Sequence, residues 1–160
     1  MTIDNSRTII SLRIKLFIAS VAVLTWLALA YLGKVIKFPL LGMSDISWTI
    51  LFTSIWVVAA FLPMFLNYQF ISFSDDKDKI IFRYFSAGIV GGKKNSVEID
   101  KRSFAGYEVE ERFFGRISSI ILLQRFKEGI AKYPPIYISA LSVKEKEKVF
   151  RMLNLYSPRA

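Results

Sequence analysis

The sequence contains an uncharged stretch, residues 46–74, that changes from helix-like to strand-like patterning without a polar spacer. Its first part, ISWTILFTSIWVVAAFLPMFL, is long and apolar enough to cross a bilayer as an α-helix. Its second part, NYQFISFS, alternates apolar and polar residues, which is typical of a strand with one buried face. The sequence therefore predicts a membrane helix that leads almost directly into the first strand of a folded domain.

A second apolar run, residues 16–32, comes earlier in the chain and reads LFIASVAVLTWLALAYL. Its seventeen residues lie at the short end of what spans a bilayer, and basic residues precede it. A signal peptide is the alternative, because Ala28-Leu29-Ala30 resembles a small-residue cleavage site. The run is longer than the usual signal-peptide core of about 7–15 residues, which favours a retained membrane helix.

The two apolar runs together predict a helical hairpin. Residues 33–45, GKVIKFPLLGMSD, contain Pro39 and two glycines and suit a turn between antiparallel helices. We expect transmembrane helices at about residues 14–33 and 46–67, within an N-terminal part of residues 1–68, followed by a folded domain of residues 69–160. The charges agree with this division, because 17 of the 22 Lys and Arg side chains fall in residues 75–160.

The orientation of such a hairpin follows from the Lys and Arg residues near the helix ends. Three precede the first helix, two lie in the connecting loop, and five follow the second helix within residues 77–94. The positive-inside rule therefore places both termini in the cytoplasm. The chain's net charge of +9 suits a surface of anionic lipid on that side.

The folded domain is predicted to consist of short strands closed by one helix. The expected strands are residues 69–74, 79–85, 95–100, 104–110 and 117–124, a hairpin around Gly129 within 126–133, and residues 136–140. Ser142 and Glu145 form a capping-box pattern at the start of the helix. Its apolar stripe comprises Val149, Phe150, Leu153 and Tyr156. The predicted fold class is therefore α+β.

Four segments of this domain carry a family resemblance: IIFRYF, NSVEID, IILLQRFKEG and ISALSVKEKEKVFRMLN. Together with the preceding hairpin, they resemble the bacterial PH-like domain family in its membrane-anchored form. The resemblance covers more than half of the chain and rests on patterns of apolarity. It implies a β-sandwich or partial barrel of about seven strands with a C-terminal capping helix, held at a bacterial inner membrane. It implies no catalytic residues.

The composition excludes several kinds of chemistry. The chain has no cysteine and no histidine, so disulfides, thiolate metal sites, cysteine nucleophiles and imidazole bases are absent. Glu108 and Glu110 share one face of an expected strand, but no other feature suggests sugar cleavage, and a solvated face is favoured. The glycines of residues 88–92 lack the GK[ST] ending of a P-loop. We expect no catalytic residue, no metal and no cofactor.

Two loops are candidates for contact with lipid. Counting strands up and down from the second helix places residues 86–94 and 112–116 near the bilayer and the acidic turn of residues 75–78 far from it. The candidate lipid-binding residues are Lys93, Lys94, Arg112, Phe113, Phe114 and Arg116, with Ile89 and Val90 as further apolar groups. The alternative is that GGKK is a solvated turn and that the two phenylalanines belong to the core.

The sequence thus predicts a non-enzymatic, membrane-anchored interaction module. Its domain would bind anionic lipid headgroups, protein partners or both, and the chain would act alone or as a homo-oligomer. The alternative is a small accessory subunit of a larger membrane complex, in which helix faces bearing Ala19, Ala22, Ala59 and Ala60 pack against partner helices. Nucleic acid is not expected as a partner, because acidic residues are interleaved with the basic ones.

Overall fold

The computed structural model describes residues 2–33, 35–87 and 92–157, which form two compact units. One unit, residues 10–62, consists of two apolar helices, and we call it the helical unit. The other unites the residues up to Ile9 with those from Pro63 onward, and we call it the β domain. The architecture is α+β, as predicted: helix, two antiparallel sheets and a C-terminal helix.

The helical unit contains all but the first turn of α1 (Ser6–Leu27), which continues through a π-helical turn (Ala28–Leu32), and all but the last turn of α2 (Asp45–Phe65). The helices are joined by polar contacts between small hydroxyls and aromatic side chains. Trp56 Nε1 donates to Ser20 Oγ at 2.9 Å, and the hydroxyls of Tyr31 and Thr49 lie 3.0 Å apart. Both helices are long and apolar enough to cross a membrane by length and composition.

Helix α1 begins at Ser6, earlier than the predicted start near residue 14. The Asp4 carboxylate accepts hydrogen bonds from the backbone and side chain of Ser6, and the Ile9 amide donates to the Asn5 carbonyl at 3.1 Å. The Asp4 carboxylate thus satisfies the Ser6 amide, a first-turn donor with no partner within the helix, and the Ile9 amide makes the first regular bond of the helix. The polar residues before the first apolar run, which were not predicted to be structured, therefore form strand β1 and the first turns of α1.

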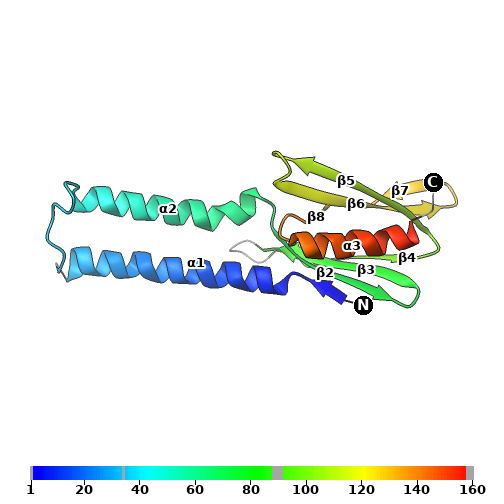
Figure 1. Ribbon diagram of the computed structural model, residues 1–160, viewed down its shortest axis with the longest axis horizontal. Coiled ribbons are helices and arrows are strands. Elements are labelled where there is room, and N and C mark those ends of the chain that lie inside the picture. Colours follow the sequence, from blue (N-terminus) through cyan, green and yellow to red (C-terminus); the bar gives the residue numbers. More distant parts are fainter. Residues whose placement is uncertain (1, 34, 88–91, 158–160) are drawn as a thin grey trace. The chain divides into compact units, whose positions relative to one another are not determined.

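The β domain holds two sheets (Figure 1). The first, in the order β1-β2-β3-β4, contains β1 (Thr2–Asp4), β2 (Gln69–Asp76), β3 (Lys79–Ser86) and β4 (Asn95–Asp100). The second contains β5 (Phe104–Arg112), β6 (Ile117–Phe126), β7 (Gly129–Lys132) and β8 (Ile136–Tyr137), with β7 and β8 both paired to β6. The predicted strands from residue 69 onward are present, except that the last, expected at residues 136–140, covers only Ile136–Tyr137. Strand β1 was not predicted.

Strand β1 joins the start of the chain to the sheet that follows α2. It pairs antiparallel with β2, with Ile3 opposite Phe73. The next residue, Asn5, is completely buried: its Oδ1 accepts from the Ile71 amide at 2.9 Å, and its Nδ2 donates to the Gln69 carbonyl at 2.8 Å. The segments on either side of the helical unit therefore belong to one sheet.

The core of the β domain lies between the inner faces of the two sheets. Phe73 and Phe82 pack at 4.9 Å between ring centroids and are fully buried, as are Ile120 and Leu122 of β6. Helix α3 (Val143–Tyr156) contacts the edge strands β1 and β5, and Figure 1 shows it lying between the two sheets. The helix thus closes the open side of the sandwich with its apolar stripe.

The predicted capping box at the start of α3 is confirmed. The Glu145 amide donates to Ser142 Oγ at 3.4 Å, and the Ser142 amide donates to Glu145 Oε2 at 2.7 Å. Two backbone donors of the first turn are satisfied in this way. The cap fixes where the helix begins and therefore which of its residues face the core.

Candidate functional site

One end of the β domain gathers the residues that lead into α1 and α2. Ile9 is buried there against Ala87 and Ala140, and β2 begins there with Gln69. The Gln69 side chain accepts from the Tyr137 amide at 3.0 Å, and β8 pairs with the start of β6, directly after the β5–β6 turn. We call this the helix end of the β domain. The end of β3, the residues directly before β4 and the β5–β6 turn also lie at this end.

The β5–β6 turn presents two phenylalanines to solvent. Phe113 is 74% exposed and Phe114 fully exposed, so the alternative that they belong to the core is wrong. Both adopt positive φ angles, 52° and 54°, which are uncommon for bulky residues, and Gly115 follows with φ 78°. The Arg116 amide donates to the Phe113 carbonyl at 3.1 Å and closes the turn. A strained backbone therefore holds two large apolar side chains outside the core.

Arginines flank these phenylalanines on both sides. Arg112 forms an exposed ion pair with Glu110 at 3.2 Å. Arg116 is exposed and forms no ion pair with a carboxylate of the described residues. The turn thus joins apolar surface to positive charge, and its single acidic contact is a surface pair of the kind that contributes little to stability.

Lys93 and Lys94 lie directly before β4, and both are exposed. They belong to the first sheet, whereas residues 112–116 belong to the second, so the structure brings the two groups to the same end of the domain without joining them in one cluster. Ile89 and Val90, which the sequence suggested as further apolar groups, lie outside the described residues.

A groove on the outer face of the first sheet was not predicted from the sequence. It has a volume of about 370 Å³, and its lining includes Arg83 and Lys94 together with Phe70 and Phe85. Arg83 had been counted only as one of several cations after the second helix. The alternation within KIIFRYFS places it on the outer face, but its neighbours come from two other strands, and only strand pairing identifies them.

The glutamates considered as a catalytic pair contact cations instead. Lys132 Nζ lies 2.7 Å from Glu108 Oε1, and Arg112 contacts Glu110. Within residues 2–33, 35–87 and 92–157, no group of three or more His, Cys, Asp or Glu side chains is arranged to hold a metal ion. These carboxylates therefore belong to an exposed, ion-paired strand face.

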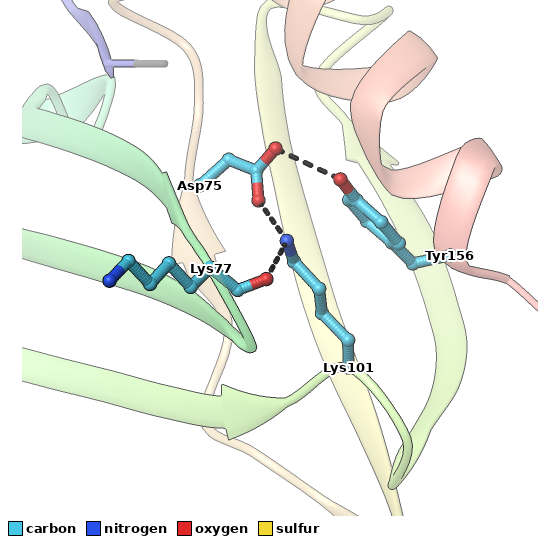
Figure 2. Close-up of polar contacts among 4 residues, drawn as sticks. All are labelled: Asp75, Lys77, Lys101 and Tyr156. Carbon is cyan, nitrogen blue, oxygen red and sulfur yellow. Dashed lines mark hydrogen bonds and ion pairs between the residues drawn. The ribbon is translucent and has the colours of Figure 1, made fainter.

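The opposite end of the domain, which we call the far end, carries a polar cluster (Figure 2). Asp75 pairs with Lys101, and Tyr156 of α3 donates to Asp75 Oδ2 at 2.9 Å. Lys101 Nζ also donates to the Lys77 carbonyl at 2.7 Å and lies 4.6 Å from the centre of the Tyr156 ring. The cluster ties the β2–β3 turn, the β4–β5 turn and the end of α3 together.

These contacts shift both ionisable groups toward their charged forms. Burial acts to raise the pKa of the Asp75 carboxyl, but the hydrogen bonds from Lys101 and Tyr156 and the Lys101 charge outweigh it, so the pKa lies below its usual value. The hydrogen bond to Asp75 raises the pKa of Lys101 against the opposing effect of burial.

The Asp75 cluster predicts a pH-dependent stability. Because its folded pKa is depressed, Asp75 stabilises the fold above its unfolded pKa of about 3.9, and this contribution is lost as the pH falls through the folded value. We expect Asp75→Asn to lower the melting temperature of the detergent-solubilised chain at pH 6 and the difference from wild type to shrink toward pH 2. Asp76→Asn, at the exposed neighbouring position, should show little difference at either pH. A gap for Asp75→Asn that is constant across this range would contradict the assignment.

Comparison of the chain with protein-family models, with curated proteins and with solved structures finds no match. The resemblance to PH-like domains stays a prediction from the sequence.

Proposed function

We propose that this chain is a non-enzymatic, membrane-anchored interaction module, in which a PH-like domain is held at the anionic inner leaflet of a bacterial inner membrane. The helices α1 and α2 cross the bilayer as a hairpin. The helix end of the β domain contacts lipid headgroups through the β5–β6 turn and the lysines before β4.

The pairing of β1 with β2 supports the hairpin. Strand β1 precedes α1 and β2 follows α2, yet the two strands exchange hydrogen bonds and Asn5 is buried between them. Two segments of one sheet must lie on the same side of a membrane, so both helices cross or neither does. The excess of Lys and Arg on these flanks favours the cytoplasmic side. Cleavage after residue 30 would remove β1 from the sheet, which supports a retained first helix.

The observation that carries the proposal is the exposure of Phe113 and Phe114 between two arginines. Exposed aromatic side chains next to cations are typical of surfaces that insert into the headgroup region of anionic membranes. Lys93 and Lys94 add charge at the same end, and each basic residue near such a surface contributes about 1 kcal/mol of attraction. Residues of this kind at the end where the chain enters apolar helices support a lipid-facing role.

The second proposal is that the chain is an accessory subunit of a larger membrane complex. One observation limits which helix surface could contact a partner. Of the four alanines assigned to a partner-facing surface, Ala60 is buried within the described structure and Ala19 is half-buried, whereas Ala22 and Ala59 are exposed. A partner helix would therefore pack against a surface that includes Ala22 and Ala59 but not Ala60.

The absence of cysteine makes a site-specific test of the lipid-facing turn direct. We expect a bimane fluorophore on Phe114→Cys, in the full chain reconstituted into anionic vesicles, to be quenched by phospholipids brominated near the headgroup. The matched control is Phe126→Cys, which is 53% exposed at the opposite end of β6 and should show little quenching. Equal quenching at the two positions would contradict the proposed orientation of the domain.

A further inference from the structure

The outer face of the first sheet places one arginine between two serine hydroxyls. Strand pairing sets Ser72 of β2 opposite Arg83 of β3, and Arg83 opposite Ser96 of β4. All three side chains line the groove described above, and Arg83 is exposed. A guanidinium has donors arranged to bind two oxygens at once, and the serine hydroxyls add donors on both sides.

The charge of the groove is positive. Arg83 and Lys94 both line it, and no Asp or Glu is among the described residues that do. The two carboxylates nearest in register on this face lie outside the groove. Asp4, opposite Ser72, accepts two hydrogen bonds from Ser6. Glu98, two residues beyond Ser96 on β4, pairs with Lys79 at 3.8 Å. Neither cation of the groove forms an ion pair with another described residue. The groove therefore offers two available cations to an anion.

The floor of the groove nearest the helix end is aromatic. Phe70 and Phe85 face each other across β2 and β3 and stack with 4.7 Å between ring centroids and an interplanar angle of 23°. Both are half-buried and line the groove beside the polar row. An anion that occupies this groove would thus contact apolar surface on the side that leads toward α2.

We propose that this groove binds the phosphate group of an anionic membrane phospholipid. Arg83 binds two phosphate oxygens, Lys94 neutralises the remaining charge, the hydroxyls of Ser72 and Ser96 donate to the phosphate, and the stacked phenylalanines contact the glycerol and the first acyl carbons. The inference rests on the proposed function, because the groove can meet a phospholipid only if the β domain is held at a membrane. It adds a specific headgroup site that is separate from the β5–β6 turn.

The test uses the full chain in nonionic detergent, titrated with dihexanoyl phosphatidic acid and followed by the NMR shifts of the Ser72, Arg83 and Ser96 amides. We expect saturable shifts, and Arg83→Gln should weaken binding about 10- to 100-fold, because it removes charge-assisted hydrogen bonds. Arg83→Lys, which keeps the charge but loses the two-oxygen geometry, should fall between wild type and Arg83→Gln. The control is Arg125→Gln, an arginine that lines a separate pocket together with Asp78 and Asp100, and it should bind as wild type.

Two further ligands identify the source of the phosphate. Dihexanoyl phosphatidylcholine should bind much more weakly, and inorganic phosphate should produce shifts only at far higher concentration. Equal binding of inorganic phosphate and the lipid would overturn the assignment to a phospholipid, and unchanged lipid binding by Arg83→Gln would overturn the site.

This outcome is independent of the quenching experiment on the β5–β6 turn. Arg83→Gln should leave the quenching at position 114 unchanged, because the two sites lie on different sheets. Arg83-dependent lipid binding without quenching at position 114 would support the groove and contradict the proposed orientation. Quenching with no Arg83-dependent binding would support the orientation and overturn the groove.

Discussion

Replacing Asn5 with alanine is expected to lower the free energy of unfolding of the β domain by about 2–5 kcal/mol, because one buried and one partly buried backbone group lose a partner. The Asn5 side chain is completely buried and bonds both the Ile71 amide and the Gln69 carbonyl. Alanine is too short to replace either bond, and water has no access to a residue with no exposed surface. The loss should loosen β1 and the start of α1 together.

The measurement is hydrogen–deuterium exchange of the β2 and β3 amides in the detergent-solubilised full chain, which reports the free energy of opening for this sheet. The matched control is Thr2→Ala, an exposed position on β1 whose replacement should leave exchange close to wild type. Wild-type protection in Asn5→Ala would show that β1 is not tied to the sheet by this side chain. It would also weaken the argument that both flanks of the helical unit lie on one side of a membrane.

Replacing Phe82 with alanine is expected to have the largest effect of any substitution considered, a loss of about 3–5 kcal/mol in the free energy of unfolding. Phe82 has no exposed surface and packs on Phe73 in the middle of the core. Its removal leaves a cavity that the surrounding strands fill only in part. Chemical denaturation in detergent, monitored by β-sheet circular dichroism, would measure the loss.

The matched control for Phe82→Ala is Phe85→Ala, three residues later on the same strand. Phe85 lies on the outer face of β3, half-buried in the groove and stacked on Phe70. We expect Phe85→Ala to destabilise the domain much less than Phe82→Ala but to weaken binding of dihexanoyl phosphatidic acid. If the two variants lost similar stability, the distinction between core face and groove face would be wrong.

Much of the β domain was predictable, because the signals that specify strands and helix caps are local. The alternation in KIIFRYF and NSVEID predicted the bounds of two strands to within one residue. The signal is clear because side chains alternate between the two faces of a strand wherever one face is buried. The pair Ser142 and Glu145 predicted the start of α3 because a capping box is completed within four residues.

The candidate site was predictable only in part. The candidates Phe113, Phe114 and their flanking arginines followed from the strand count and the residue types of this loop, but an apolar pair at a strand end is equally compatible with burial. The hairpin geometry, with consecutive positive φ angles, decided that both rings point outward. The position of Arg83 between two serines could not be read from the chain at all, because those serines lie in other strands.

The sequence by itself determined the order and type of nearly all elements, the segregation of apolar helices from a charged β domain, and the exclusion of cysteine and histidine chemistry. Only the tertiary structure decided that the first residues form a strand of the same sheet that follows α2. The physical reason is distance along the chain: Asn5 and Ile71 are 66 positions apart, and a buried amide reveals its partners only when the fold brings them together. Because β1 pairs with β2, the segment before α1 and the segment after α2 belong to the same domain. No local pattern in the sequence indicates this pairing.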